Sequence, residues 1–182
     1  MHRCHTHVIW TTYMTWPPGD DRGHWSPLFD FYGHLIEQGH RLNLPDPVTR
    51  SRASEWAREP PRVLTPSDRR IVADTIRDVL ATQMESSAKV YAAAIERTHV
   101  HLLLGPLEED IERAVGRIKG RTSSAVVHEG SETGRQRTWT AGYWEVFLFE
   151  DRVVPTVAHY IESHNERWGL PAAPYDWSTP WR

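Results

Sequence analysis

Two histidines stand one residue apart in the run ERTHVHLLLGP, at the start of an apolar stretch. In an extended strand successive side chains alternate between faces, so His99 and His101 point the same way, roughly 7 Å apart at Cα. Two imidazoles at that spacing suit a shared divalent metal ion. They equally suit two half-exposed histidines that hydrogen-bond on the surface of a sheet, because an isolated His-x-His motif is weakly specific.

A second candidate pair lies near the C-terminus, in the run YIESHNERWGL. Tyr160 and His164 are four residues apart, so on a helix they share a face within one turn. One interpretation makes Tyr160 a nucleophile and His164 a third metal ligand beside His99 and His101. The other is structural, because most tyrosines pack part of the ring and turn the hydroxyl to water. Asn165 points about 100° away on the helix and is the poorer ligand candidate.

The elements that would hold these residues follow the order β-α-β-β-α-β-α. Runs of β-branched and aromatic residues predict strands over residues 6–14, 88–95, 99–105 and 138–150, the last of them bent. Periodic apolar residues predict helices over residues 65–84, 108–130 and 152–169. This order indicates an α+β, ferredoxin-like (RRM-like) antiparallel sheet with helices packed on one face, plus a C-terminal helix that carries Tyr160. We expect one domain over residues 1–182, with an irregular insertion around 26–62.

Three motifs, in this order, resemble those of the HUH single-tyrosine transposases, which include insertion-sequence and REP-associated tyrosine transposases. HVHLLL is similar to the family's His-hydrophobic-His strand, and WTAGYW to its W-x-x-G-[YW] segment. YIESHNERWGL matches the Y-I-E-L-N-P-x-R-A-G-L pattern of transposon-associated relatives without a gap. His164 departs from the metal-binding Gln or Asn that the family usually has there, and Thr98 from its Asn or Asp. Imidazole binds divalent metals at least as well as an amide, which preserves the site.

The resemblance implies a metal-dependent endonuclease and strand transferase that acts on single-stranded or hairpin DNA, as a monomer or a homodimer. Tyr160 would be the catalytic residue, and His99, His101 and His164 would bind a divalent metal, Mg²⁺ or Mn²⁺. Attack of the phenolate on phosphorus leaves a 5′-phosphotyrosine intermediate and a free 3′-hydroxyl, and a different 3′-hydroxyl can then capture the strand. The alternative is a domesticated relative that recognises a DNA hairpin or RNA without cutting it.

Basic residues of the second long helix and of the loop after it are the candidate nucleic-acid contacts. They are Arg113, Arg117, Lys119, Arg121, Arg135 and Arg137. A solvated helix face explains these residues equally well. Unpaired bases stack on aromatic rings, and the candidates for that role are Tyr143, Trp144, Trp177 and Trp181, with core packing favoured for the first two. His5 and His7 are expected to decorate the edge of the first strand.

The composition excludes several other classes. A formal net charge of −3 argues against indiscriminate coating of duplex DNA, which usually takes a basic domain. No apolar run approaches the ~20 residues of a membrane span, and the first residues lack the apolar block of a signal peptide. Histidine-triad nucleotide hydrolases need a third alternate histidine where Leu103 stands. With one cysteine, Cys4, and no possible internal disulfide, we expect a cytoplasmic protein. The resemblance to DNA transposases implies an association with the bacterial nucleoid.

Overall fold

The computed structural model describes residues 4–22, 45–84, 88–131 and 134–181. The chain forms two compact units, one of Met1–Tyr13 with Arg62–Arg182 and one of Met14–Pro61. In the second unit the helix α2 (Pro47–Trp56) begins after Asp46, whose carboxylate accepts a hydrogen bond from the Val48 backbone N–H. This helix falls within the stretch of residues 26–62 that was expected to be irregular, of which residues 26–44 lie outside the described residues. A single domain with an insertion therefore stays a prediction.

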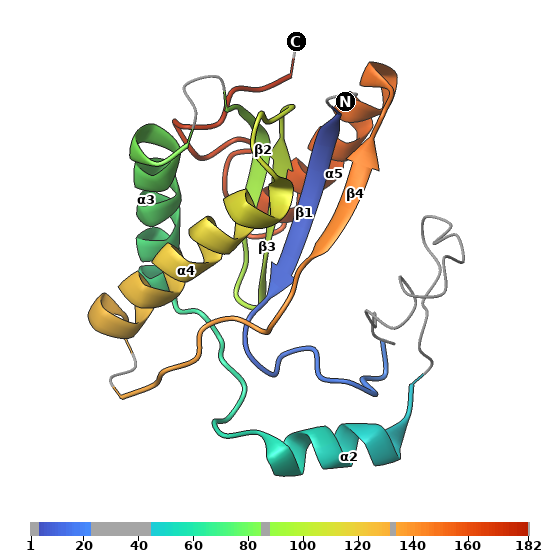
Figure 1. Ribbon diagram of the computed structural model, residues 1–182, viewed down its shortest axis with the longest axis vertical. Helices are drawn as coiled ribbons and strands as arrows, with labels where there is room; N and C mark the ends of the chain where they lie inside the picture. The colour runs from blue at the N-terminus through green and yellow to red at the C-terminus, as the bar shows by residue number, and fades with distance from the viewer. Residues whose placement is uncertain (1–3, 23–44, 85–87, 132–133, 182) are drawn as a thin grey trace. The chain divides into compact units, whose positions relative to one another are not determined.

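The larger unit is built on a four-stranded sheet in the order β2-β3-β1-β4, in which every neighbouring pair is antiparallel (Figure 1). The strands are β1 (His5–Thr11), β2 (Val90–Ile95), β3 (His99–Leu104) and β4 (Trp144–Leu148). β2 and β3 form a hairpin, and β1 and β3 are the two central strands. This arrangement confirms the ferredoxin-like α+β prediction.

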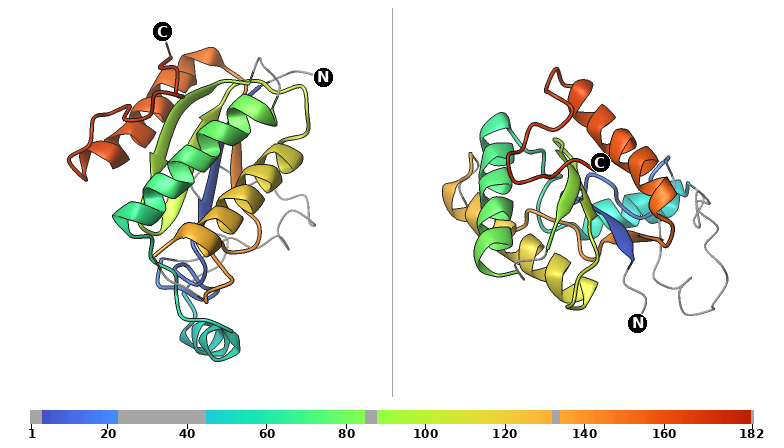
Figure 2. Two further views of the ribbon diagram at one scale, coloured as in Figure 1. Left: turned by 90° about the vertical axis from the view of Figure 1, so that its left-hand side faces the viewer. Right: turned by 90° about the horizontal axis from the view of Figure 1, so that it is seen from above.

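Helices pack on both faces of this sheet, as the two views of Figure 2 show. On one face lie α3 (Pro66–Thr82) and α4 (Ile111–Glu129), which also pack on each other. On the other face lies α5 (Val154–Glu166), against β2 and β3. Of the helices in the described ranges, none is long and apolar enough to cross a membrane.

The alternation of side chains along β3 divides the apolar residues between two cores. Val100, Leu102 and Leu104 belong to the larger core, beneath α3 and α4. Leu103 belongs to the smaller core, beneath α5. Because residues two apart on a strand share a face, His101 points toward α5 with Leu103, as predicted for the site-bearing face.

Small residues in β2 determine how closely α5 approaches the sheet. Ala92 and Ala94 are buried in the smaller core, where they meet Ala158 and Ile161 of the helix. Methyl side chains on both partners leave room for the helix backbone to lie near the strand. The histidines of the adjacent strand β3 therefore come within reach of side chains on α5.

The aromatic strand expected over residues 138–150 is shorter in the structure. β4 spans Trp144–Leu148, and upstream of it only an isolated bridge joins Trp139 to Thr12. Gly142 lies between the two with φ of 73°, in the left-handed region that favours glycine. This residue turns the chain and ends the pairing, which explains why one continuous strand does not form.

Candidate metal and nucleophile site

Three histidines from two distant segments meet on the α5 face of the sheet. His99 and His101 come from β3 and His164 from α5, and one candidate ligand atom from each lies within 4.8 Å of the others. The ring centroids are 4.8 Å apart for His99 and His101, 4.5 Å for His101 and His164, and 5.6 Å for His99 and His164. Three imidazoles at these separations can converge on one divalent ion.

Two of these rings carry a buried nitrogen that the protein does not satisfy. His101 is 3% exposed and His164 is 6% exposed. Within the described part of the chain, Nε2 of His101 and Nε2 of His164 have no hydrogen-bond partner. A buried polar atom without a partner costs roughly 1–3 kcal/mol, and a metal ion is a ligand that would remove this cost. The residues present therefore fit a divalent metal.

The other nitrogens of the same two rings are held by neighbouring side chains. Nδ1 of His164 is hydrogen-bonded to Oε1 of Glu96, in the arrangement in which a carboxylate orients a metal-binding imidazole. Nε2 of His99 lies 3.8 Å from the same Glu96 oxygen. Nδ1 of His101 lies 3.0 Å from Nε2 of His7 on β1. The rings of His101 and His164 are thus each held at Nδ1, which leaves Nε2 of both available to a metal ion, while Nδ1 of His99 lies 3.1 Å from the Thr98 hydroxyl oxygen.

The electrostatic environment favours the neutral form of His7 and His101 and the ionised form of Glu96. Burial, followed by the charge of His164, lowers the pKa of His7 to about 4. Burial and the neighbouring histidines lower the pKa of His101 well below its ordinary value. Burial alone would raise the pKa of Glu96, but the hydrogen bond with His164 and the charge of His99 outweigh it and lower that pKa. Neutral nitrogens are the form that binds metal ions.

Tyr160 stands beside this cluster, one turn before His164 on α5. Its ring centroid lies 4.9 Å from that of His164, 5.8 Å from that of His101 and 6.2 Å from that of His7, each contact edge-on. The side chain is 49% exposed, so a large substrate can reach it. Tyr143, the tyrosine just before β4, instead packs against the larger core on the opposite face, where burial and then Glu145 raise the pKa of its hydroxyl.

Three further residues beside the histidine cluster were not predicted as site residues. His7 was expected at a strand edge, but β1 is a central strand, and the residue is buried against His101. Glu96 ends the segment just before the β2–β3 turn and contacts both His99 and His164. Arg167 follows the last residue of α5, and its positive charge contributes to lowering the pKa of His101. A signal for His7 existed, because its His-x-His spacing repeats that of β3.

Asn165 serves the fold in this structure. The residue is 3% exposed, and its side-chain amide donates hydrogen bonds to the carbonyls of Ala93 at 2.9 Å and Ala172 at 2.8 Å. These bonds fasten the end of α5 to β2 and to the segment that follows the helix. The amide group is therefore engaged elsewhere, as its expected angular position relative to Tyr160 suggests.

The basic residues proposed to contact nucleic acid do not join this cluster. Arg113, Arg117, Lys119 and Arg121 belong to α4, on the opposite face of the sheet. Arg117 forms an ion pair with Glu109 at 2.7 Å. The remaining two, Arg135 and Arg137, lie in the loop after α4, and the guanidinium of Arg137 stands 5.4 Å from the Tyr13 ring centroid.

Lys119 has a role in the fold. Its ammonium group donates hydrogen bonds to the carbonyls of Thr140, at 2.9 Å, and Gly142, and burial lowers its pKa to about 8. These bonds hold the turn that precedes β4. A DNA-binding role for the residues of α4 and its following loop stays a prediction.

Comparisons with known proteins give one family. The sequence pattern of the IS200-like transposases matches residues 62–164, more than half of the chain. No curated protein matches it. Among solved structures, a REP-associated tyrosine transposase bound to a REP hairpin is 12% identical, with a TM-score of 0.46 over 93% of this chain and 70% of that one. A protein of Deinococcus radiodurans described as a candidate transposase is 18% identical, with a TM-score of 0.40 over 90% and 92%.

Proposed function

Because the chain belongs to the IS200-like transposase family, we propose that it cleaves and transfers single-stranded DNA with Tyr160 as its nucleophile. The observation that carries the proposal is the convergence of Tyr160 with three histidines whose candidate ligand atoms lie within 4.8 Å of one another. The matched segment of the family contains all four residues. A DNA-acting, transposase-type role follows from the family, whereas metal-dependent cleavage by Tyr160 is our proposal.

A divalent metal held by His99, His101 and His164, Mg²⁺ or Mn²⁺, would withdraw negative charge from the nonbridging oxygens of a phosphodiester. Glu96 keeps the His164 ring oriented through its Nδ1 atom, and His7 does the same for His101. These contacts fix the rings before DNA arrives, so little reorganisation is needed when the substrate binds.

The half-exposed ring of Tyr160 lets its hydroxyl reach a backbone phosphate from the solvent side. The bond that forms joins the phenolic oxygen to phosphorus, and the bond that breaks joins phosphorus to the 3′-oxygen of the neighbouring nucleotide. The phenolic proton passes to water, and the departing 3′-oxygen takes a proton from water. The product is a 5′-phosphotyrosine. When another 3′-hydroxyl attacks its phosphorus, a phosphodiester bond to the new strand forms and the bond to the tyrosine oxygen breaks.

Arg167 supplies a fixed positive charge on the same side of α5. The residue stands three positions beyond His164 and seven beyond Tyr160, spacings that place all three on one helical face. Its guanidinium donates to the backbone carbonyl of Ser163 at 3.2 Å and to the Ser163 hydroxyl at 3.3 Å. These bonds restrain the exposed side chain, and on this proposal its charge is available to the phosphate that Tyr160 attacks.

The experiment is a denaturing gel of labelled hairpin DNA with single-stranded flanks, incubated with protein and MnCl₂. We expect a covalent protein–DNA adduct from the wild-type protein that disappears with EDTA, in His99→Ala and in Tyr160→Phe. The last change removes one oxygen from a half-exposed ring, so thermal stability should be unchanged. Tyr143→Phe is the matched control and should keep the adduct.

Two outcomes contradict the proposal. An adduct that persists in Tyr160→Phe would assign the nucleophile elsewhere. Tight, metal-independent binding of the hairpin by the wild-type protein with no adduct at all would support the non-catalytic binding protein instead.

A further inference from the structure

A tryptophan stands exposed just beyond the end of α5, beside the histidine cluster. The helix ends at Glu166, and the chain continues through one more turn, in which the Trp168 backbone N–H donates to the carbonyl of Asn165 at 3.0 Å. Gly169, with φ of 71°, then turns the chain away. Trp168 is 47% exposed, so its backbone is fixed by the end of the helix while much of the indole faces solvent.

Two neighbouring side chains hold the indole. The side chain of Trp168 hydrogen-bonds to Glu96, the carboxylate that also holds Nδ1 of His164. Because Nε1–H is the only donor of an indole, this bond fixes the polar edge of the ring. The guanidinium of Arg69, in the first turn of α3, lies 5.9 Å from the ring centroid, within the range of a cation–π contact. The ring is therefore both exposed and restrained.

Trp168 and Tyr160 flank the cluster from opposite ends. Trp168 stands four positions beyond His164 and eight beyond Tyr160, so the three side chains follow one another along one helical face. Successive members of this row are displaced by about 6 Å along the helix axis. At one end the Tyr160 ring meets that of His101 edge-on, with centroids 5.8 Å apart. At the other end Trp168 meets Glu96.

We infer that Trp168 is a stacking platform for the base of the nucleotide that leaves with the 3′-hydroxyl when Tyr160 attacks. The inference rests on the proposed function, because that function puts a DNA phosphate at the cluster. In an in-line displacement the attacking and leaving oxygens lie on opposite sides of phosphorus. Since Tyr160 attacks from one end of the cluster, the leaving nucleotide points toward the other end, where the indole stands. Exposed aromatic rings bind unpaired bases by stacking, largely regardless of sequence.

The charges around the indole fit a nucleotide better than an apolar partner. Arg167 directly precedes Trp168, and Arg97 is exposed in the turn between β2 and β3. Nε of Arg69 is buried and has no hydrogen-bond partner within the described part of the chain. Guanidinium groups bind phosphate oxygens by charge-assisted hydrogen bonds. A nucleotide thus offers a phosphate to these groups and a flat base to the ring.

The aromatic residues that the sequence suggested for stacking are half-buried: Tyr143, Trp144, Trp177 and Trp181. Tyr143 and Trp177 pack against the larger core, and Trp181 packs against the smaller one. Trp168 was not predicted for this role, because no local pattern places it beside Glu96. Its position follows from the docking of α5.

A platform at this place would hold the cleaved strand after the reaction. Stacking keeps the base, and with it the new 3′-hydroxyl, near the phosphotyrosine, so that the strand is rejoined more readily than it is lost. A base that is paired in a duplex is not free to stack on the ring. Trp168 is thereby a specificity-determining residue for single-stranded DNA on the 3′-hydroxyl side of the cleaved bond.

The experiment measures the binding of hairpins that lack one base. A tight-binding hairpin is selected from a pool with randomised single-stranded flanks, the bond that the wild-type protein cleaves is mapped, and a stable abasic nucleotide is placed on either side of it. Affinities are measured with MnCl₂ in Tyr160→Phe, so that no strand is cut during the titration. On the 3′-hydroxyl side we expect the abasic change to weaken binding roughly five-fold or more.

Adding Trp168→Ala should weaken binding of the intact hairpin by a similar factor, and the same abasic change should then have no further effect. Trp168→Phe keeps a ring but loses the N–H that bonds to Glu96. This variant should recover most of the affinity for DNA. Affinity as low as that of Trp168→Ala would mean that the residue acts only by orienting Glu96, and would overturn the inference.

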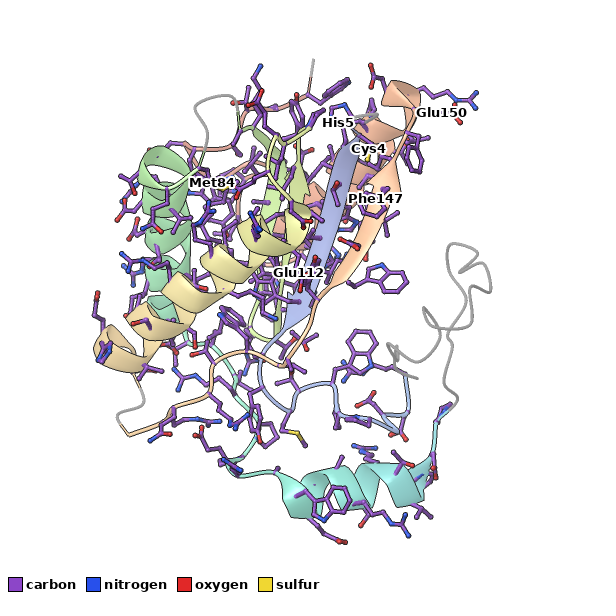
Figure 3. All side chains as sticks on the ribbon, in the orientation of Figure 1. Cys4, His5, Met84, Glu112, Phe147 and Glu150 are labelled. Atoms are coloured by element: carbon purple, nitrogen blue, oxygen red, sulfur yellow. The ribbon has the colours of Figure 1, made fainter. Side chains whose placement is uncertain are left out.

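Phe147→Ala is the control for the loss of an exposed ring. Phe147, labelled in Figure 3, is 41% exposed, and it pairs with Thr6, whose other partner Leu104 belongs to the larger core on the face opposite α5. This variant should bind each hairpin like the parent protein. Circular dichroism should show the same fold for all variants.

Equal affinity of Trp168→Ala and its parent would overturn the inference, as would a Trp168-dependent abasic penalty on the phosphotyrosine side of the cleaved bond. The adduct gel separates this result from the proposed chemistry. If the adduct forms and no abasic position depends on Trp168, the inference falls while the cleavage mechanism stands. If no adduct forms, every flank position is tested, and a Trp168-dependent penalty at one of them means that the stacking stands and the cleavage mechanism falls.

Discussion

Replacing Glu96 by glutamine should weaken divalent-metal binding, although this residue is not one of the three proposed ligands. Its carboxylate holds Nδ1 of His164 and lies 3.8 Å from Nε2 of His99. A hydrogen bond to a charged group contributes about 1.5–3 kcal/mol, and a neutral one roughly half as much. Glutamine at this position would therefore lose about 0.8–1.5 kcal/mol of hydrogen-bond energy at His164 alone, which corresponds to a roughly 4- to 12-fold loss of metal affinity.

The loss of the charge near His99 adds to this value. The total should fall within the roughly 10- to 100-fold range typical of residues that orient a metal ligand. Isothermal titration calorimetry with MnCl₂ measures it directly. Glu109→Gln is the matched control, because it removes the same charge from the ion pair with Arg117 on α4, on the other face of the sheet. Unchanged affinity in Glu96→Gln, or an equal loss in both variants, would refute this reasoning.

Three further outcomes are expected. His164→Ala should weaken metal binding in calorimetry more than Asn165→Ala does. Asn165→Ala should instead lower the free energy of unfolding by about 1–3 kcal/mol, because buried carbonyls lose their hydrogen-bond donor. A larger loss of metal affinity in Asn165→Ala than in His164→Ala would contradict the placement of both residues. Hairpin or single-stranded DNA should outcompete random duplex, and its affinity should fall with added salt; equal competition by duplex would count against the substrate class. Ala94→Leu should destabilise the protein by about 1–3 kcal/mol in urea unfolding, because the fully buried methyl group lies in the core beneath α5; unchanged stability would mean that this core accommodates larger side chains.

The residues predicted from local spacing are those that the structure brings together. His99 and His101 share a face because strand side chains alternate, and Tyr160 and His164 because helical positions four apart are neighbours. Both relations hold within a single element and can be read directly from the sequence. The meeting of the two pairs was one of two interpretations of the residues, and only the family resemblance favoured it, since it depends on the docking of α5 against the β2–β3 hairpin.

The residues that were missed depend on non-local relations. His7 reaches His101 only through the register of β1 against β3, which no local pattern specifies. Glu96 reaches His164 only after α5 has packed on the sheet. The location of α4 has the same origin, because amphipathic periodicity identifies the buried side of a helix and leaves open which face of the sheet it covers. The sequence therefore could not show whether the basic residues of α4 lie on the same face of the sheet as the histidines or on the opposite face.

The helix α5 carries both Tyr160 and His164, and its docking rests on the small residues of β2 and on the amide of Asn165. On the proposed function, the nucleophile and one metal ligand belong to the same helix. If α5 detaches from the sheet, the enzyme loses its nucleophile and one of its three metal ligands together. A state with a complete metal site but a displaced tyrosine, or with the tyrosine in place but an incomplete metal site, is then scarcely populated. For an enzyme that breaks DNA strands, such all-or-none assembly is a safeguard, because cutting and rejoining are enabled and disabled together.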